Sequence, residues 1–590
     1  MDTVVRLSPF LSVSPQLSET DIGISGALGF RTILNSRPDG ETEGQPTSAA
    51  IEAAARRHGL DYRYLPVISG KITDGNVEDF GKIMAEVRGP VLAYCRTGTR
   101  STSLWALHEA RHLDPEAILK ACAAAGYHLD ALRPKLEARW TGEPAGSTPA
   151  PVGATGMGPR GYDVVIVGGG AAGIATAASL LRRRPSLAIA VIEPGDKHYY
   201  QAGWTLVGAG LFDRRKTERP MDRVMPSQVT WLRSAVAGFE PEHHQVVLEE
   251  GARVRYRTLV VCPGIRLNWD GVEGLRETLG RNGVTSNYMF DLSSYTRQLV
   301  QGLRGGRALF TQPPMPIKCA GAPQKAMYLS CDQWQRRGVL SDIDVEFNTA
   351  GMVLFGVPDY VPSLMSYVER YKARLCFGST LVAIDGPGRK AWFNVKQDDG
   401  SMQRVEKGFD MIHVCPPQTA PDFVRASPLA DAAGWVEVSP ETLQHPRFGN
   451  IFGLGDACST PNAKTAAAVR KQAPVVAENV LGVLDGKGPR ALYDGYGSCP
   501  LVVERGKVVL AEFLYGGKLA PSIPFLDSTR PRWLGWFMKT RMFPVLYFDF
   551  MLKGREWLAK PQRLPHQPTA HEAAAACDFS DSAASSKGSR

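Results

Sequence analysis

The sequence lacks several features that would each define a class of protein. Its ten cysteines in 590 residues form neither a CxxC pair nor a CxxCH haem-attachment motif. This pattern argues against a disulfide framework and a c-type haem, and we predict no metal site. No run of 18 uncharged apolar residues occurs, so we expect no transmembrane helix. The first seven residues contain no apolar signal core, which argues against secretion.

Composition and charge set only broad limits. The apolar fraction of 44% and charged fraction of 22% are ordinary for a globular protein, and the length suggests about four domain-sized units. A formal charge of +9 is mildly basic, which favours an anionic partner or a membrane surface. We predict no nucleic-acid partner.

A second dinucleotide motif is missing where one could stand. The apolar run 307–311 leads into Pro313–Pro323, which contains four prolines and Cys319 but no glycine fingerprint. Proline lacks the backbone N–H that a pyrophosphate-binding loop must offer. The sequence therefore predicts one dinucleotide site and, at the place of the other, a thiol.

The dinucleotide motif that is present begins after an apolar strand. Gly168, Gly170 and Gly173 fit GxGxxG at the start of a helix, and Glu193 closes the next strand, placed to accept from ribose hydroxyls. A late strand–Gly–Asp motif, 450–457, contains Asp456. Motifs so far apart suit an FAD domain interrupted by an insertion. We predict an α/β chain whose residues 161–530 form an FAD flavoprotein with two Rossmann-like dinucleotide-binding domains.

Residues 1–140 are predicted to form a separate α/β domain, joined by a flexible linker at 141–160 that is rich in Pro, Gly, Ala, Ser and Thr. Cys95 ends an apolar strand, and a short loop leads to Arg100 at the start of a helix. Backbone N–H groups and the helix N-terminus would bind an oxyanion or a persulfide there and lower the thiol pKa. A helix-capping loop with an incidental buried cysteine is the alternative.

This first domain resembles the phosphatase-like sulfurtransferase domains of β-lactamase-hydrolase-like proteins. The motifs that carry the resemblance are Asn35-x-Arg37-Pro38-Asp39-Gly40-Glu41 and Cys95-Arg96-Thr97-Gly98-Thr99-Arg100-Ser101. Four residues separate Cys95 from Arg100, one fewer than in tyrosine phosphatases and closer to the rhodanese pattern. The resemblance implies catalytic roles for Cys95 and Arg100 in handling sulfane sulfur.

Residues 160–560 resemble sulfide:quinone oxidoreductases of the mitochondrial type. The resemblance is carried by Glu193-Pro194, His198-Tyr199-Tyr200-Gln201, Trp204 to Gly210, Lys318-Cys319-Ala320-Gly321-Ala322-Pro323-Gln324-Lys325, Asp431 to Trp435, Thr442 to His445, Lys464 to Ala468 and Tyr493-Asp494-Gly495-Tyr496. It implies FAD as cofactor, sulfide and a ubiquinone-type quinone as substrates, and a sulfane-sulfur acceptor such as glutathione or sulfite.

The same resemblance implies a redox pair of cysteines. Cys319 is expected to face the flavin and Cys458 to carry the persulfide, although Ala457 intervenes where the family has its second cysteine directly after Gly-Asp. Lys464 is expected to stabilise the reduced flavin, and Gln201 and Val236 to contact it. Most other cysteines stand in apolar contexts that favour buried small hydrophobic residues.

The end of the chain combines large aromatic residues with basic ones. Within 531–560, Pro544 divides the sequence into two predicted short amphipathic helices that would lie in the headgroup region of a membrane. A core helix or a dimer contact is the alternative. We expect residues 561–590 to be disordered and the protein to lie on the cytoplasmic face of a bacterial inner membrane.

Two other functions remain open from the sequence. A type II NADH:quinone dehydrogenase shares the expected fold but needs a nicotinamide fingerprint, which the proline loop does not supply. The first domain could instead be a cysteine phosphatase or a non-catalytic anion-binding module.

Overall fold

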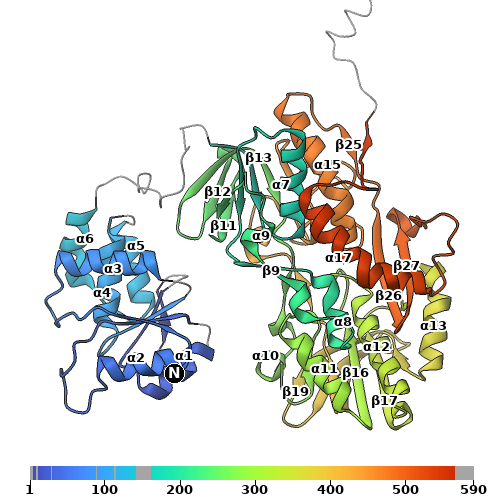
Figure 1. Cartoon of the computed structure of the whole chain (residues 1–590), viewed down its shortest axis with the longest axis horizontal. Coiled ribbons are helices and arrows are strands. Elements are labelled where there is room, and N and C mark those ends of the chain that lie inside the picture. Colours follow the sequence, from blue (N-terminus) through green and yellow to red (C-terminus); the bar gives the residue numbers. More distant parts are fainter. Residues whose placement is uncertain are drawn as a thin grey trace, which may run out of the picture. The chain divides into compact units, whose positions relative to one another are not determined.

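The computed structural model describes residues 4–7, 11–27, 30–87, 90–111, 114–140 and 161–564. The chain separates into two compact units, residues 1–156 and 157–590, and each is described by itself (Figure 1). The predicted linker, 141–160, lies outside the described residues.

The first unit is a five-stranded sheet covered on both faces. The strand order is β1 (Val5–Arg6), β2 (Leu11–Ser14), β5 (Val91–Tyr94), β3 (Thr32–Asn35) and β4 (Asp61–Tyr64), parallel except for β1. One face carries α1 (Glu19–Ala27) and α2 (Ser48–Arg57); the other carries α3 (Asp74–Glu86), α4 (Thr99–Glu109), α5 (Pro115–Ala124) and α6 (Arg133–Arg139) (Figure 1). Because both faces are covered, β3 and β5 are buried at every position.

The second unit contains a sheet typical of dinucleotide binding. Parallel strands β10 (Thr230–Leu232), β7 (Ile189–Ile192), β6 (Tyr162–Val167), β13 (Arg253–Val261) and β24 (Ile451–Gly453) are joined at one edge by antiparallel β12 (Gln245–Leu248) and β11 (Val236–Glu240). Helices α7 (Ala171–Arg183) and α15 (Ala466–Leu484) pack together on it. Strand β24 follows the others by about two hundred residues, so an insertion interrupts this sheet, as expected.

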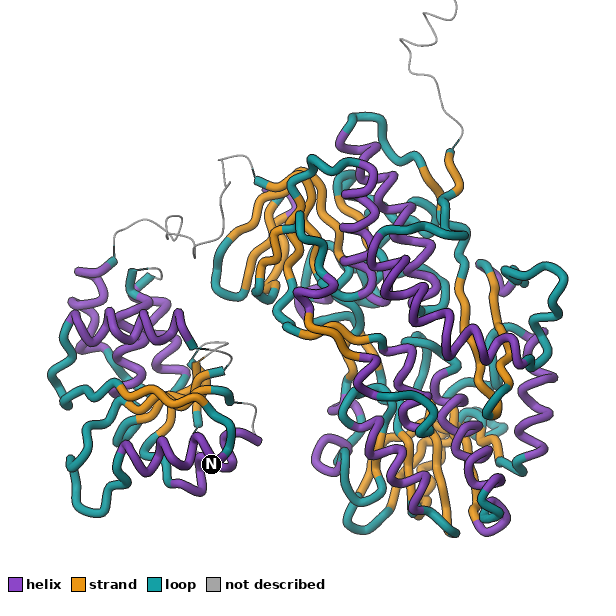
Figure 2. Tube along the Cα trace, viewed as in Figure 1, coloured by secondary structure: helices purple, strands orange, loops and turns teal. Residues whose placement is uncertain are grey.

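The insertion forms a second parallel sheet. Its order is β15 (Val284–Thr285), β22 (Met411–His413), β16 (Gly306–Gln312), β17 (Ile343–Thr349) and β18 (Arg374–Cys376). Helices α11 (Leu292–Gly302), α12 (Ala322–Arg336) and α13 (Val361–Arg370) accompany it, and a meander of β19 (Ser379–Asp385), β20 (Lys390–Lys396) and β21 (Met402–Gly408) extends it (Figure 2). The two Rossmann-like domains predicted from the sequence are thus present.

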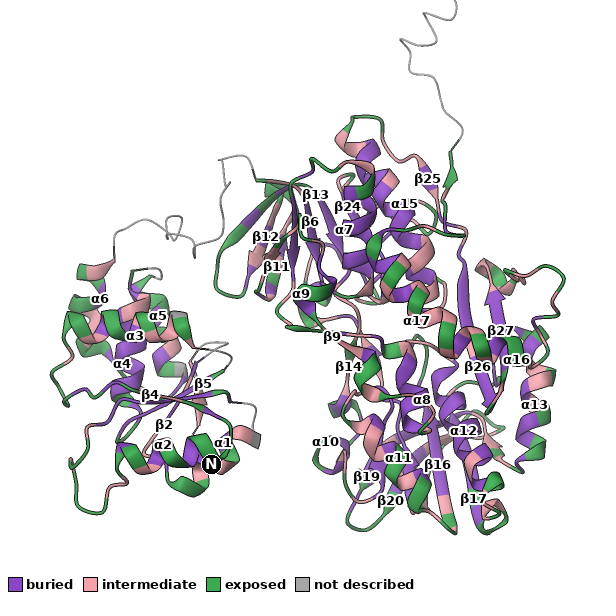
Figure 3. Cartoon of the chain, viewed as in Figure 1, coloured by how far each residue is buried: buried purple, intermediate pink, exposed green. Residues whose placement is uncertain are grey.

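A hairpin and a helical run complete the second unit. The hairpin, β26 (Gly497–Glu504) with β27 (Lys507–Phe513), is largely buried and packs on α12 (Figure 3). The helical run consists of α16 (Trp533–Phe537), η10 (Met538–Met542), α17 (Phe543–Val545), η11 (Leu546–Phe550) and η12 (Met551–Lys553). No helix of the described residues is long and apolar enough to cross a bilayer.

The C-terminal region differs from the sequence prediction in two respects. Pro544 does not divide the helical run, because π-helical turns precede and follow it and backbone angles stay helical on both sides. Within the tail that was predicted to be disordered, β28 (Gln562–Arg563) is ordered and pairs with β25 (Ala491–Leu492). Residues 565–590 lie outside the described residues.

Candidate active site

Within the second unit, a cavity of about 620 Å³ lies between the sheet that contains β6 and β7, the Cys319 loop, the hairpin and the C-terminal helical run. The glycine motif forms one wall. A Cβ at Gly173 would lie 1.9 Å from the Gly168 carbonyl oxygen, so helix α7 can approach β6 only without a side chain there. Gly170 has open space where its side chain would be, and no side chain caps α7. These free N–H groups at a helix start fit a pyrophosphate.

The carboxylate of Glu193, just after β7, is fixed by two backbone hydrogen bonds. It accepts hydrogen bonds of 2.8 Å from the N–H groups of Gly169 and Gly195, and it lines the cavity. Two backbone donors fix the carboxylate while its remaining lone pairs stay available to ribose hydroxyls. The residues present therefore fit a dinucleotide cofactor.

Cys319 lies in the loop between β16 and α12, at the cavity wall. Its sulfur is 3.5 Å from Cys499 of β26, which the sequence analysis did not single out. Both thiols are reduced in the structure. Cys319 has a left-handed backbone conformation, φ +50°, which is costly for a residue with a side chain and typical of functional sites.

Two lysines set the electrostatics of the cysteine pair. Lys325 Nζ lies 3.1 Å from Cys319 Sγ. The hydrogen bond between the thiols lowers the pKa of Cys319, and Lys325 lowers it further. That hydrogen bond and burial raise the pKa of Cys499. These effects favour the thiolate form of Cys319 and the thiol form of Cys499.

The second lysine comes from the C-terminal helical run. Lys539 is only 4% exposed, and its Nζ donates to the Ala202 carbonyl at 2.9 Å. Burial lowers the pKa of Lys539 to about 8, and its charge also lowers the pKa of Cys319. The sequence analysis placed this lysine on a charged membrane-facing rim; the structure turns it inward.

Gly321 makes the close approach of Cys499 possible. A Cβ at Gly321 would lie 2.3 Å from Leu501 Cδ2 and 2.6 Å from Cys499 Sγ. Only glycine lets the loop lie directly against the hairpin. This glycine, with Cys499 on an otherwise apolar strand, is the signal from which the pairing could have been inferred.

Cys458 has other neighbours than predicted. Its sulfur lies 3.1 Å from the Gly455 carbonyl oxygen and 3.2 Å from Thr460 Oγ1, in a buried position. The chain after Gly455–Ala457 is extended at Cys458, and helix α15 starts only at Ala466. Cys458 therefore does not sit at a helix N-terminus, and the structure gives Cys319 a different thiol neighbour.

The other residues predicted to contact the flavin divide into two groups. Gln201, Asp456 and Lys464 line the cavity. Lys318 Nζ joins the first two, at 2.5 Å from Gln201 Oε1 and 3.5 Å from an Asp456 oxygen. Lys464 Nζ donates to the carbonyls of Asp456 and Cys458, at 2.8 and 2.9 Å, which holds its ammonium beside the cavity.

Val236, which was also predicted to contact the flavin, lies elsewhere than Gln201, Asp456 and Lys464. It is buried on β11, opposite Leu248, in the core of the first sheet, and it is not among the described residues that line the cavity. Its strand, β11, is the antiparallel edge of the sheet.

In the first unit, Cys95 follows β5 and is buried, as is Arg100 at the start of α4. Arg100 donates to the Val67 carbonyl and to Glu41, each at 2.7 Å, and Arg37 donates to the same Glu41 oxygen at 2.8 Å. The two predicted motifs thus meet through Glu41, whose pKa the Arg100 hydrogen bond lowers.

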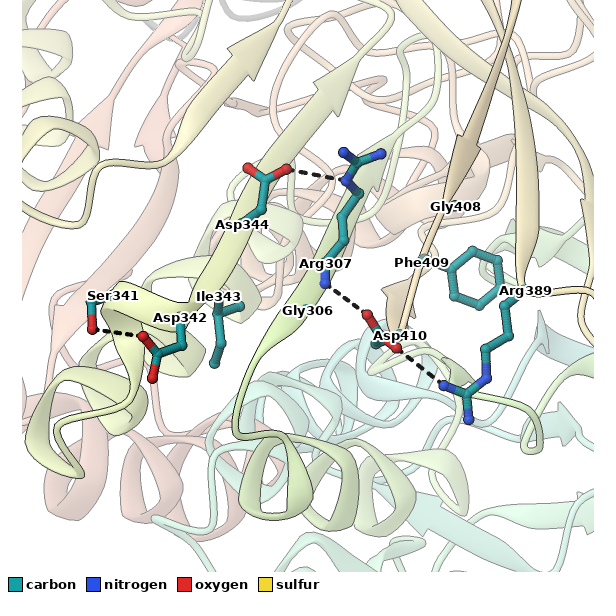
Figure 4. A pocket seen from close by; sticks show the side chains of 10 residues that line it. All are labelled: Gly306, Arg307, Ser341, Asp342, Ile343, Asp344, Arg389, Gly408, Phe409 and Asp410. Carbon is teal, nitrogen blue, oxygen red and sulfur yellow. Dashed lines mark hydrogen bonds and ion pairs between the residues drawn. The ribbon is translucent and has the colours of Figure 1, made fainter.

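A second cavity, of about 660 Å³, lies at the opposite ends of β16 and β17 (Figure 4). Most of its charged side chains pair with one another, Arg307 with Asp344 at 3.1 Å and Arg389 with Asp410 at 3.2 Å, and Asp342 accepts from the Ser341 hydroxyl. Because these charges satisfy each other, the cavity offers no evident chemistry.

Two Rossmann-like domains, a dinucleotide cradle and a thiol pair beside it define a flavoprotein disulfide oxidoreductase. In agreement, residues 162–299 match the model of the pyridine nucleotide-disulphide oxidoreductase family. The chain is 39% identical over 400 residues to the mitochondrial sulfide:quinone oxidoreductase of Dictyostelium discoideum, covering 67% of this chain and 87% of that protein. The mouse protein of the same name is 37% identical, with the same coverage. The chain belongs to the sulfide:quinone oxidoreductase family, and this membership implies FAD as its cofactor.

Two further comparisons concern the fold and the first unit. A crystal structure of the sulfide:quinone oxidoreductase from Aquifex aeolicus matches with a TM-score of 0.56 at 19% identity, over 67% of this chain and 92% of that one. Residues 4–112 match the phosphatase-like domain of beta-lactamase hydrolase-like proteins. A protein of that name from Agrobacterium fabrum is 41% identical over 106 residues, 18% of this chain and 25% of that protein. The first unit is therefore phosphatase-like.

The predicted location on a bacterial inner membrane is wrong. The related sulfide:quinone oxidoreductases of Dictyostelium, mouse and Schizosaccharomyces pombe, at 34–39% identity, are mitochondrial proteins of eukaryotes. Basic and aromatic residues can indicate a membrane surface, but they do not distinguish one organelle or organism from another.

Proposed function

We propose that this protein oxidises sulfide to sulfane sulfur with Cys319 and Cys499 as the redox pair, and passes the electrons through FAD to quinone. The observation that carries the proposal is the 3.5 Å contact between the two sulfurs at the wall of the cofactor cavity. Modest side-chain movement closes this gap to a disulfide, whose S–S bond is about 2.05 Å long.

The two sulfurs have different roles. Sulfide attacks the oxidised pair at Cys499, so that an S–S bond forms there, the Cys319–Cys499 bond breaks, and Cys319 leaves as a thiolate. The environment favours this direction, because Lys325 stabilises negative charge on Cys319. Cys319, unlike Cys499, lines the cofactor cavity, so its thiolate is the donor to the cofactor. FAD supplies the two-electron acceptor when it is bound.

Anaerobic titration of the purified protein with sulfide tests this function. Sulfide should bleach the flavin absorbance of the wild-type protein and not that of the Cys319→Ser variant. Bleaching by NADH at the same rate would instead favour the alternative NADH:quinone dehydrogenase activity.

We propose further that Cys95 accepts the sulfane sulfur. Supporting this, the Cys95 loop leads into α4, and Glu41 holds Arg100 beside the loop. Residues 141–160 join the units, so a tether of this length keeps the two thiols at a high effective concentration if its reach matches the gap. Mass spectrometry after turnover with sulfide should find a persulfide on Cys95. Hydrolysis of an aryl phosphate that Cys95→Ser abolishes would instead indicate a phosphatase.

The C-terminal helical run is our candidate for membrane contact. Several large apolar side chains there are exposed, among them Trp533 at 65%, Phe537 and Val545, and Trp557 and Leu558 just after the run are exposed as well. Trp533 and Phe537 stack, with ring centroids 5.8 Å apart. A Trp533→Glu/Phe537→Glu variant should lose flotation with liposomes. Met352→Glu, at an exposed apolar residue outside the helical run, is the matched control.

A further inference from the structure

One buried carboxylate lines the cavity on the side of the C-terminal helical run. Glu512 of β27 is 9% exposed and lines the cavity together with Tyr496 and Ser522. One of its oxygens accepts from the Tyr496 hydroxyl, and from the Ser522 hydroxyl at 2.6 Å. The other accepts from the Ser522 N–H at 2.9 Å.

This carboxylate has no charge partner in the described part of the chain, where no ion pair involves it. The same hairpin offers a contrast. Glu504 also accepts from a tyrosine, Tyr367, but it is ion-paired with Arg370 at 2.8 Å and Lys507 at 2.9 Å, and it does not line the cavity. Glu504 is thus in direct contact with two cations, whereas no ion pair of the described residues involves Glu512; Lys471, whose Nζ lies 5.5 Å from the centre of the Tyr496 ring, is a nearby cation.

The surroundings of Glu512 are apolar on the cavity side and wet on the other. Leu510, Ile523, Leu534, Met538 and Phe543 line the cavity near the hairpin and the helical run. Ser522 is exposed to solvent while Glu512 and Tyr496 are buried. The exposed Ser522 hydroxyl, the buried Glu512 carboxylate and the buried Tyr496 phenol therefore form a hydrogen-bonded row that connects solvent with the apolar lining of the cavity.

The row and Cys499 lie on opposite faces of the hairpin. Cys499 stands opposite Ala511, and both belong to the core beneath the hairpin. Their neighbours Ser498 and Glu512 also stand opposite each other and line the cavity. Strand alternation thus places Cys499 and the Ser522–Glu512–Tyr496 row on different faces of the hairpin, while Cys319 lines the same cavity as the row.

We propose that Tyr496 and Glu512 deliver the proton that completes quinone reduction. The inference rests on the proposed function, which brings a quinone to this cavity. The quinone takes a hydride equivalent, two electrons and one proton, from the reduced cofactor. Glu512 first takes the second proton from water at Ser522; the Tyr496 hydroxyl then gives its proton to the quinone oxygen and receives one from Glu512, which returns to the carboxylate. The net change is one quinone to one quinol.

Half-reactions measured by stopped flow test this assignment. The protein is first reduced anaerobically with sulfide and then mixed with decylubiquinone. We expect Tyr496→Phe and Glu512→Gln to slow flavin reoxidation by at least about a hundredfold, the usual contribution of a positioned acid. Tyr367→Phe in α13 and Glu504→Gln on the same hairpin, a hydrogen-bonded tyrosine–glutamate pair outside the cavity, should reoxidise within twofold of wild type.

Binding is measured independently of turnover. Quenching of tryptophan fluorescence by decylubiquinone should give dissociation constants for Tyr496→Phe and Glu512→Gln within about threefold of wild type. Unchanged reoxidation in both variants, or a loss of binding as large as the loss of rate, would overturn the proton role. Failure of sulfide to bleach the wild-type flavin would instead refute the proposed function itself.

Discussion

The Cys319 and Cys95 regions place a thiol in two different chemical settings. Cys319 has a second sulfur at 3.5 Å, a lysine at 3.1 Å and a cofactor cavity at its side. Cys95 lies in the loop between a buried strand and α4, and Arg100 at the start of α4 is paired with Glu41. A redox thiol needs a partner sulfur and an electron acceptor, whereas a carrier thiol needs only an anion-binding loop. The difference between the regions matches a division between making sulfane sulfur and receiving it.

The largest expected effect comes from removing the partner sulfur. Cys499→Ser should abolish flavin reduction by sulfide, with a loss of at least about a hundredfold, because no disulfide can form for sulfide to attack. Stopped-flow bleaching of the flavin measures it. Cys458→Ser should retain most of the rate; the reverse result would restore the pairing predicted from the sequence.

A smaller effect is expected from the lysine beside Cys319. Lys325→Met removes a positive charge that lowers the pKa of Cys319. Where the pH lies below the pKa, a rise of one pKa unit corresponds to about a tenfold loss of thiolate, and flavin reduction in that range should slow by up to that factor. The pH dependence of alkylation at Cys319 measures the shift. Lys407→Met, at a lysine 3.5 Å from Cys376, is the control, and an equal effect there would refute the electrostatic role of Lys325.

The lowered pKa of Lys539 leads us to expect that the rate of flavin reduction by sulfide changes several-fold with pH. The pKa of Lys539 is about 8, so sulfide-dependent flavin reduction should fall as the pH rises through 8 and the ammonium loses its proton beside Lys325, Cys319 and Cys499. Lys539→Met should be slower at pH 7 and lack this fall. A fall of the same size in the variant would assign it to another group.

The pH dependence of the stability of the protein is a second test of the lowered pKa of Lys539. The unfolded chain, with a pKa near the ordinary 10.5, binds more protons than the folded chain between pH 8 and 10.5. Stability therefore rises with pH across that window. Lys539→Met should remove this rise and increase the Tm at pH 7, since replacing a buried charge by an apolar side chain removes its desolvation cost.

The smallest effect on flavin reduction is expected in the first unit. Cys95→Ser should change the rate of flavin bleaching by less than about twofold, because the redox pair lies wholly in the second unit. The persulfide on this unit should nevertheless disappear from the mass spectrum after turnover. A large loss of flavin reduction would show that the two regions do not act separately.

Much of the fold followed from local patterns in the sequence. The GxGxxG turn and Glu193 lie at a cofactor cavity because strand, glycine turn and helix are contiguous. The cysteine partner did not follow, because Cys319 and Cys499 are 180 residues apart and Cys499 stands in a strand that reads as core. Sequence spacing favoured Cys458, whose extended backbone directs its sulfur to Gly455 and Thr460 instead.

The surroundings of two charged residues, Lys539 and Glu512, could not be predicted from the sequence either. Lys539 stands among basic and aromatic residues that read as a membrane-facing surface, and only the packing of the helical run shows that it points inward to Ala202. The sequence did not single out Glu512 either, because the proposed role rests on a contact that only the fold shows: among the described residues Glu504 has ion pairs and Glu512 has none.

The alternation of side chains along β26 and β27 has one more consequence. Quinones are electrophiles that add thiolates irreversibly, so an enzyme that holds both must keep them from meeting. Here the hairpin backbone separates only Cys499, the sulfur that sulfide attacks, from Ser498 and Glu512, whereas Cys319 lines the same cavity as Glu512. A register slip of a single residue would exchange the two faces and leave the sulfur of Cys499 open to arylation by the enzyme's own electron acceptor.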